Sequence, residues 1–93
     1  VDSFDVVLCL EMLEHDPLPI VTMQNIGRVL RPGGAFVITT RGNGFHEHNR
    51  PDLWRFMRDG MELLIDMIGQ TSSRRIEPDP QASGWLVAGQ LGG

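Results

Sequence analysis

Residues 28–40 read RVLRPGGAFVITT, and this stretch contains a helix end, a tight turn and a strand. An apolar helical stripe ends at Leu30. Pro32 lacks the amide proton that a helix interior needs, and it biases the residue before it away from helical backbone angles. The two glycines that follow tolerate positive φ, so the chain can reverse there. Residues 35–40 are rich in β-branched side chains, which predicts a short buried strand.

A second apolar run, FDVVLCL, occupies residues 4–10. It shows no alternation of polar and apolar residues, which is typical of a strand buried on both faces of a parallel sheet. Between the two runs, apolar residues recur with helical spacing and predict a helix that covers the sheet: Met23, Ile26, Val29 and Leu30. We therefore expect residues 6–10 and 36–40 to form adjacent parallel strands with a right-handed crossover.

The second half of the chain contains one more helix and two strands. Residues 41–51 are polar and glycine-rich, which indicates a loop. A helical stripe of Met61, Leu64, Ile65 and Ile68 follows and ends at Gly69. A weak strand around Ile76 and a closing strand at residues 84–91 then form an antiparallel hairpin at the sheet edge. The sequence predicts a single α/β domain over residues 1–93 with the order β-α-β-α-β-β.

Composition limits the possible functions. The chain has 93 residues, of which 41% are hydrophobic and 22% charged, as in ordinary soluble globular proteins. A net charge of −4 argues against a general binder of nucleic-acid phosphates. The single cysteine, Cys9, cannot form an internal disulfide, which favours a reducing cytoplasm. The longest apolar run, residues 6–10, is too short to span a bilayer, so no membrane partner is expected.

Three motifs occur in a characteristic order and spacing. They are FDVV leading to LEH (residues 4–15), RVLRPGG (28–34) and HNRPDLWRF (48–56). Together they cover nearly the whole chain and resemble the class I S-adenosylmethionine-dependent methyltransferases, in particular the type 11-like ones. The resemblance implies a partial Rossmann-like methyltransferase fold and covers the fourth to the seventh strand, the carboxyl-terminal half of the family fold.

The resemblance also implies an activity and a set of site residues. Such enzymes transfer a methyl group from S-adenosylmethionine to a small-molecule or hydroxyl acceptor. In this chain Leu10, Glu11 and Met12 would flank the cofactor. His15 and His48 would face the acceptor as catalytic residues. His15 has a side chain suited to a general base near neutral pH, and it can alternatively orient the loop.

Residues 11–15 form the pattern Glu-x-x-Glu-His. In a helical turn, Glu11 lies on the same face as Glu14 or His15, and two carboxylates with an imidazole can hold a divalent metal. His48 would be a fourth ligand. The pattern resembles the metal site of small-RNA 2′-O-methyltransferases and of some ubiquinone-pathway O-methyltransferases, where the metal would lower the pKa of the acceptor hydroxyls. Alternatively, Glu14 and His15 cap or hydrogen-bond the turn.

Two family features are absent from residues 1–93: the glycine-rich loop after the first strand and the acid that ends the second. The chain also begins with Val rather than Met. We therefore expect a piece of a longer protein that does not methylate alone. The alternative is a non-catalytic truncated remnant or interaction domain, either as a homo-oligomer or with a partner that supplies the missing amino-terminal half. A dinucleotide oxidoreductase is disfavoured because no Gly-x-Gly-x-x-Gly motif is present.

Overall fold

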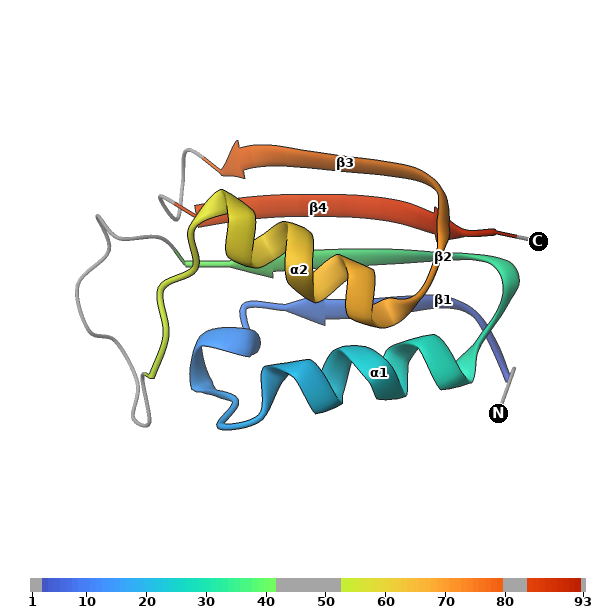
Figure 1. Cartoon of the computed structure of the whole chain (residues 1–93), viewed down its shortest axis with the longest axis horizontal. Coiled ribbons are helices and arrows are strands. Elements are labelled where there is room, and N and C mark those ends of the chain that lie inside the picture. The colour runs from blue at the N-terminus through green and yellow to red at the C-terminus, as the bar shows by residue number, and fades with distance from the viewer. Residues whose placement is uncertain (1–2, 42–52, 80–83, 93) are drawn as a thin grey trace.

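The computed structural model describes residues 3–41, 53–79 and 84–92. Two helices lie against a four-stranded sheet, and all strands run along the long axis of the molecule (Figure 1). The elements are β1 (Phe4–Leu10), the short 3₁₀ helix η1 (Leu13–His15), α1 (Pro19–Val29), β2 (Leu30–Thr40), α2 (Arg58–Ile68), β3 (Thr71–Asp79) and β4 (Gly84–Leu91). This order confirms the predicted α/β fold.

The sheet has the strand order β1-β2-β4-β3. β1 and β2 pair in parallel, with Val7 opposite Phe36 and Cys9 opposite Ile38, as the sequence predicts. β4 pairs antiparallel with both β2 and β3, so the last two strands form the expected antiparallel edge hairpin. Because β1 is at the other edge, β2 is its only strand partner among the described residues.

The junction between α1 and β2 differs from the prediction. The helix ends at Val29, and Leu30 already belongs to the strand, so the Pro-Gly-Gly segment lies within an irregular beginning of β2. The register with β1 shifts there, between the pairs of Phe4 and Val6. Gly33 has a φ of 80°, an angle that favours glycine, which explains how the strand bends without a separate loop.

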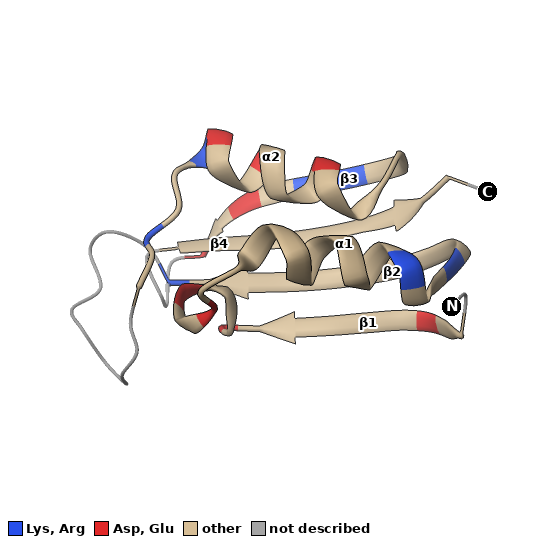
Figure 2. Cartoon of the chain, turned by 60° about the horizontal axis from the view of Figure 1, so that its bottom comes forward, with Lys and Arg blue, Asp and Glu red and all other residues tan. Residues whose placement is uncertain are grey.

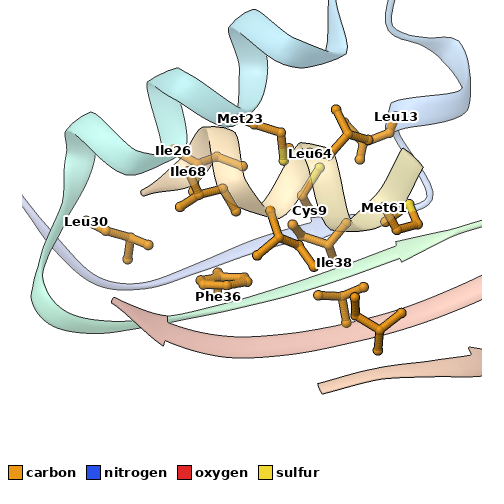
Figure 3. Packing of buried hydrophobic residues seen from close by; sticks show 13 residues of the cluster. Cys9, Leu13, Met23, Ile26, Leu30, Phe36, Ile38, Met61, Leu64 and Ile68 are labelled. Atoms are coloured by element: carbon orange, nitrogen blue, oxygen red, sulfur yellow. The ribbon is translucent and has the colours of Figure 1, made fainter. Parts of the chain in front are cut away.

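The core lies between the helices and one face of the sheet (Figure 3). The predicted stripe of α2 is buried in full, and Met23 and Ile26 of α1 pack against it. Sheet residues in one row across the strands complete the core: Cys9, Ile38, Val87 and Ile76. Helical periodicity therefore identified the buried side of both helices correctly.

The opposite side of the sheet, here called the outer face, does not fit the prediction that β1 is buried on both faces. Val6, Leu8 and Leu10 are 55%, 61% and 52% exposed, whereas Cys9 between the last two is 6% exposed. Both helices cover the same face of the sheet, so among the described residues no helix covers the outer one. The outer row that starts at Leu8 continues through Val37 and Ala88 to Arg75, so its apolar part lies over β1 and β2.

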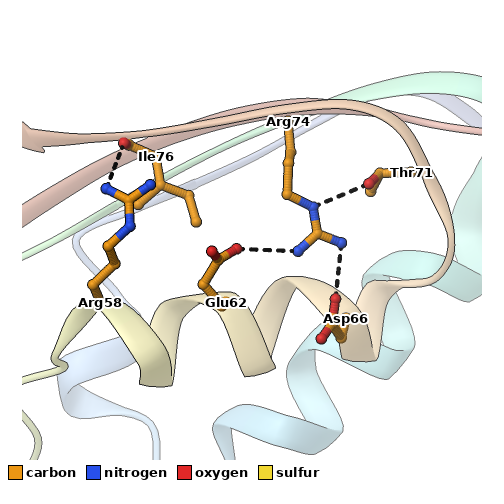
Figure 4. A network of polar contacts seen from close by, with 6 residues as sticks. All are labelled: Arg58, Glu62, Asp66, Thr71, Arg74 and Ile76. Atoms are coloured by element: carbon orange, nitrogen blue, oxygen red, sulfur yellow. Dashed lines mark hydrogen bonds and ion pairs between the residues drawn. The ribbon is translucent and has the colours of Figure 1, made fainter.

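Polar contacts connect α2 to β3 (Figure 4). The Arg74 guanidinium donates to Glu62 at 3.3 Å, to Asp66 at 2.8 Å and to Thr71 at 3.1 Å. Arg58 donates to the carbonyl of Ile76 at 3.3 Å. Over the described elements, charged residues gather at the ends of helices and strands and on α2 and β3, while most of β1 and α1 carries none (Figure 2). None of the helices in the described part of the chain is long and apolar enough to cross a membrane.

The close crossing of α1 over α2 predicts that Gly27→Ala destabilises the fold. A Cβ at Gly27 would lie 1.9 Å from the backbone oxygen of Ile68, which cannot move without shifting a helix. Overpacking of this kind costs about 1–3 kcal/mol, and we expect a melting temperature roughly 10 °C lower. Gly60→Ala is the matched control, because its Cβ meets only Phe56 at 3.9 Å. It should stabilise α2 by roughly 0.5–1 kcal/mol. Equal melting temperatures in thermal denaturation would contradict the close approach of the two helices.

Candidate functional site

The carboxyl ends of β1 and β2 meet at one edge of the sheet, where the chain leaves β1 in an unusual conformation. Glu11 has a φ of 53°, in the left-handed region that few residues other than glycine adopt. Its amide donates to the carbonyl oxygen of Thr39 at 2.8 Å and to its hydroxyl at 3.0 Å. The end of β2 therefore holds the first residue after β1 in place.

A buried ion pair lies directly behind this turn. The Glu14 side chain is fully buried, and its Oε2 lies 3.3 Å from Nε of Arg41. The same guanidinium contacts Glu11 Oε1 through Nη2 at 2.9 Å. Arg41 follows the last residue of β2, so a single arginine connects both carboxylates of the Glu-x-x-Glu-His pattern to the second strand. This role of Arg41 is not predicted by the sequence pattern, although Arg41 directly follows a predicted buried strand.

Glu14 also anchors the segment that precedes α2. Its carbonyl accepts hydrogen bonds from the amides of Leu53 at 2.7 Å and Trp54 at 3.2 Å. The Trp54 indole donates to the carbonyl of Asp16 at 2.8 Å. The Asp16 carboxylate in turn accepts from the Leu18 amide at 2.9 Å and from the Thr22 hydroxyl at the start of α1. Residues 11–18 thus form the centre at which three elements are joined.

One buried acceptor of this cluster has no hydrogen-bond partner in the part of the chain that the structure describes. Glu14 Oε1 is buried and makes no hydrogen bond within the described residues. Oε2 has the ion pair with Arg41 and lies 3.9 Å from Nε2 of His15, too far for a hydrogen bond. The His15 side chain is 25% exposed, so it connects this buried carboxylate to the surface. Because a buried carboxylate oxygen is stabilised by a donor or a cation, the site can accept one more such group.

The predicted metal set of Glu11, Glu14, His15 and His48 cannot be assembled from the described residues alone. Among them, no group of three or more histidine, cysteine, aspartate or glutamate side chains lies close enough to hold a metal ion. His48 lies outside the described residues. The guanidinium of Arg41 contacts both Glu11 and Glu14. The metal site stays a prediction.

The residues expected to flank the cofactor lie at the same edge. Leu10 and Met12 are more than half exposed, and the Glu11 side chain between them is 37% exposed. An exposed apolar pair with a fixed carboxylate suits a ligand that combines a flat apolar ring with hydroxyl or amino groups. An adenine nucleoside is such a ligand, so the residues present fit the adenosine part of S-adenosylmethionine.

Cys9 lies below this edge and takes no part in it. Burial raises the pKa of its thiol, and the nearby carboxylates of Asp16 and Glu14 raise it further. The thiol therefore stays protonated near neutral pH, and a protonated, buried thiol is a poor nucleophile. This agrees with the single cysteine being a core residue.

Comparison with known proteins shows to which family this chain belongs. A family model described as a methyltransferase domain matches residues 2–73, well over half of the chain. The chain belongs to the methyltransferase domain family. The matched part of the domain includes β1, the Glu11–His15 turn, α1, β2 and α2, and thus all described parts of the candidate site.

Curated relatives of this methyltransferase domain include ubiquinone biosynthesis O-methyltransferases. The one from Aeromonas salmonicida is 37% identical over 67 residues, which is 72% of this chain and 26% of that protein. The one from an Azoarcus species is 45% identical over 66 residues, or 71% of this chain and 26% of that protein. A third, from Hahella chejuensis, is 29% identical over 97% of this chain and 36% of its own length. The chain therefore spans about a quarter to a third of the curated relatives it matches.

Solved structures share the fold of this methyltransferase domain. An S-adenosylmethionine-dependent methyltransferase from Methanosarcina mazei has a TM-score of 0.71 at 15% identity, and the match covers 98% of this chain and 60% of that one. The 1,6-didemethyltoxoflavin-N1-methyltransferase of Burkholderia thailandensis has a TM-score of 0.66 at 21% identity, covering 99% and 45%. These matches confirm the partial Rossmann-like methyltransferase fold that the motifs suggested.

The ion pair of Arg41 with the buried Glu14 should contribute more to stability than its ion pair with the partly exposed Glu11. Arg41→Met should destabilise the domain by about 3–5 kcal/mol, because it leaves the buried Glu14 without its cation. Adding Glu14→Gln should recover part of that loss, since the double variant buries no unpaired charge. Glu11→Gln is the control, because an exposed partner contributes at most about 1 kcal/mol. Urea denaturation measures the free energy of unfolding of each variant. Strictly additive losses from Arg41→Met and Glu14→Gln would show that the two side chains are not coupled.

Proposed function

We propose that this methyltransferase domain takes part in the transfer of a methyl group from S-adenosylmethionine to a hydroxyl of a small-molecule acceptor, at the edge where β1 and β2 end. The main support is the conformation of Glu11, which Thr39 and Arg41 hold at the surface four residues before His15. A fixed site next to a titratable side chain is what an in-line transfer needs, because such reactions depend chiefly on positioning. Relatives named as O-methyltransferases favour an oxygen acceptor.

The described residues divide into a donor side and an acceptor side. Leu10, Glu11 and Met12 are proposed to hold the adenosine part of the donor. When bound, S-adenosylmethionine supplies an electrophilic methyl group on a sulfonium. His15 is proposed to accept the proton of the acceptor hydroxyl, with the buried Glu14 next to it to stabilise the imidazolium that forms. His48 is proposed as a second residue on the acceptor side and lies outside the described residues.

This chain spans about a quarter to a third of the length of its curated relatives, which limits how much of the donor site it can contain. In the described part, only one strand end, that of β1, contributes to the proposed cofactor contacts. We propose that high-affinity donor binding needs further segments, supplied by a longer chain or by a partner, and that the protein works in the cytoplasm. No Gly-x-Gly-x-x-Gly motif occurs within residues 1–93, which agrees with this proposal.

Donor binding by the isolated 93-residue chain tests this division. We expect S-adenosylhomocysteine to bind at least a thousandfold more weakly than the micromolar range, because each lost factor of ten corresponds to about 1.4 kcal/mol and most donor contacts are missing. Isothermal titration calorimetry measures the affinity. A micromolar dissociation constant for a monomeric sample would mean that residues 1–93 contain the donor site.

The role of His15 is tested in the complete gene product that carries these residues. His15→Gln should lower kcat for methyl transfer by roughly 10²–10⁴-fold, as for other general bases, and leave S-adenosylhomocysteine binding unchanged. The pH dependence of kcat should also change, because the base that takes up the proton is gone. A variant with unchanged kcat and an unchanged pH profile would exclude His15 as the base.

A second candidate function is non-catalytic association, and one observation favours it. Within the described residues β1 pairs with a strand on one side only, and Val6, Leu8 and Leu10 expose apolar side chains on its outer face, so this surface can pair with another strand. We propose that a second copy, or a partner that supplies further strands, covers it.

Size-exclusion chromatography with light scattering tests this association. The 93-residue chain should form dimers or larger species, and Leu8→Lys should shift them toward monomer because it places a charge in the middle of the apolar row. Leu63→Lys, which changes another exposed leucine on α2, is the control and should not change the mass. A monomer at every concentration up to the millimolar range would contradict the proposal.

A further inference from the structure

The segment that leads into α2, residues 53–57, is held by indole N–H groups near both of its ends. Trp54 donates to the carbonyl of Asp16 at 2.8 Å. Trp85 of β4 donates to the carbonyl of Phe56 at 2.9 Å. Figure 1 shows this segment between η1 and the first turn of α2, at the end of the molecule where β1 and β2 terminate. It is therefore bonded to the turn after β1 on one side and to β4 on the other.

Trp54 donates hydrogen bonds on both sides of His15. Its backbone amide donates to the carbonyl of Glu14 at 3.2 Å, and its indole donates to the carbonyl of Asp16 at 2.8 Å. The first carbonyl belongs to the peptide unit that precedes His15, and the second belongs to the next residue. Because peptide units are planar, fixing both carbonyls restricts the backbone between them. The direction in which the His15 side chain leaves the turn therefore depends on Trp54.

Asp16 offers the indole a fixed acceptor. Its amide donates to the carbonyl of Leu13 at 3.1 Å. Its carboxylate accepts from the Leu18 amide at 2.9 Å and from the Thr22 hydroxyl of α1. With the bond from Trp54, every polar group of Asp16 has a partner. The indole bond thus connects the segment before α2 to a point of the backbone that η1 and α1 already hold.

The side chain that this arrangement orients is the proposed base. The His15 imidazole is 25% exposed, and its Nε2 lies 3.9 Å from Glu14 Oε2. A displacement of about 1 Å in a reacting group can lower a rate by about 10²-fold. We propose that Trp54 is a positioning residue for His15, which acts through the backbone of residues 14–16. This inference rests on the proposed function, because it concerns the proposed base, but the environment of the imidazole can be measured without methyl transfer.

The first test compares Trp54→Phe with Trp85→Phe in the 93-residue chain. Each change keeps an aromatic ring and removes one indole donor from one backbone carbonyl, so the two variants are matched. The imidazole NMR signals of His15, identified by their loss in His15→Gln, should shift or broaden in Trp54→Phe and stay unchanged in Trp85→Phe. Trp54 is 44% exposed whereas Trp85 packs against the core, so Trp54→Phe should be the more stable variant in urea denaturation.

The second test measures methyl transfer by the complete gene product. Trp54→Phe should lower kcat by roughly 10–100-fold and leave KM for S-adenosylmethionine unchanged. Trp85→Phe should keep the kcat of the parent. The double variant of His15→Gln and Trp54→Phe should be no slower than His15→Gln alone, because a residue that acts only through His15 then has nothing to position. A general structural defect would instead lower kcat in both backgrounds.

Four outcomes would overturn the inference. They are unchanged His15 signals in Trp54→Phe, equal losses of kcat in the two tryptophan variants, a full further loss in the double variant, and a raised KM for the acceptor with unchanged kcat. The last result would assign Trp54 to acceptor binding instead. If His15→Gln itself leaves kcat unchanged, the proposed function fails, while the imidazole signals still report whether Trp54 orients His15. The two failures are therefore distinguishable.

Discussion

The parallel pairing of β1 with β2 is the constraint on which the rest of the structure depends. It requires a crossover, and α1 provides it within the 19 residues between Leu10 and Leu30. The pairing places both carboxyl ends at one edge, so Glu11 meets Thr39 and Arg41 can reach back to Glu14. The contacts of Glu11 and Glu14 with the end of β2 follow from this alignment. A shift of register by one residue would turn Cys9 outward and move Thr39 away from Glu11.

Within the described residues both helices cover the same face of the sheet, so that face forms the core and the other face is exposed. α1 and α2 cross closely at Gly27 and bury the inner row of the sheet, which forms one continuous core. The outer face is apolar over β1 and β2 and becomes charged toward β3, where Arg75 forms an ion pair with Glu77 at 2.6 Å. An apolar surface next to a strand edge that is unpaired within the described residues is suited to contact with further strands or another chain.

The proposed chemistry depends on the contrast between a buried carboxylate and a half-exposed one. Glu14 is held within the protein by Arg41 and beside His15, whereas Glu11 reaches the surface at a fixed backbone position. One arginine therefore orients a pair of acids with different surroundings. Trp54 is joined to the same centre, because its indole donates to the carbonyl of Asp16. Positioning of a polar reaction centre next to an apolar wall is common in small-molecule sites.

The sequence by itself determined the element order, the parallel pair, the buried stripe of α2 and the family, because local periodicity and turn residues act over short separations. It also brought Leu10, Glu11, Met12 and His15 to one edge, since they follow a single strand. Only the tertiary structure decided that Arg41 would pair with Glu11 and Glu14, because that contact joins residues about thirty positions apart. The apolar sequence of β1 likewise did not indicate that one face of this strand is exposed. Whether such a strand is covered on one face or two depends on what packs against it, and the described part of the chain has helices on one side only.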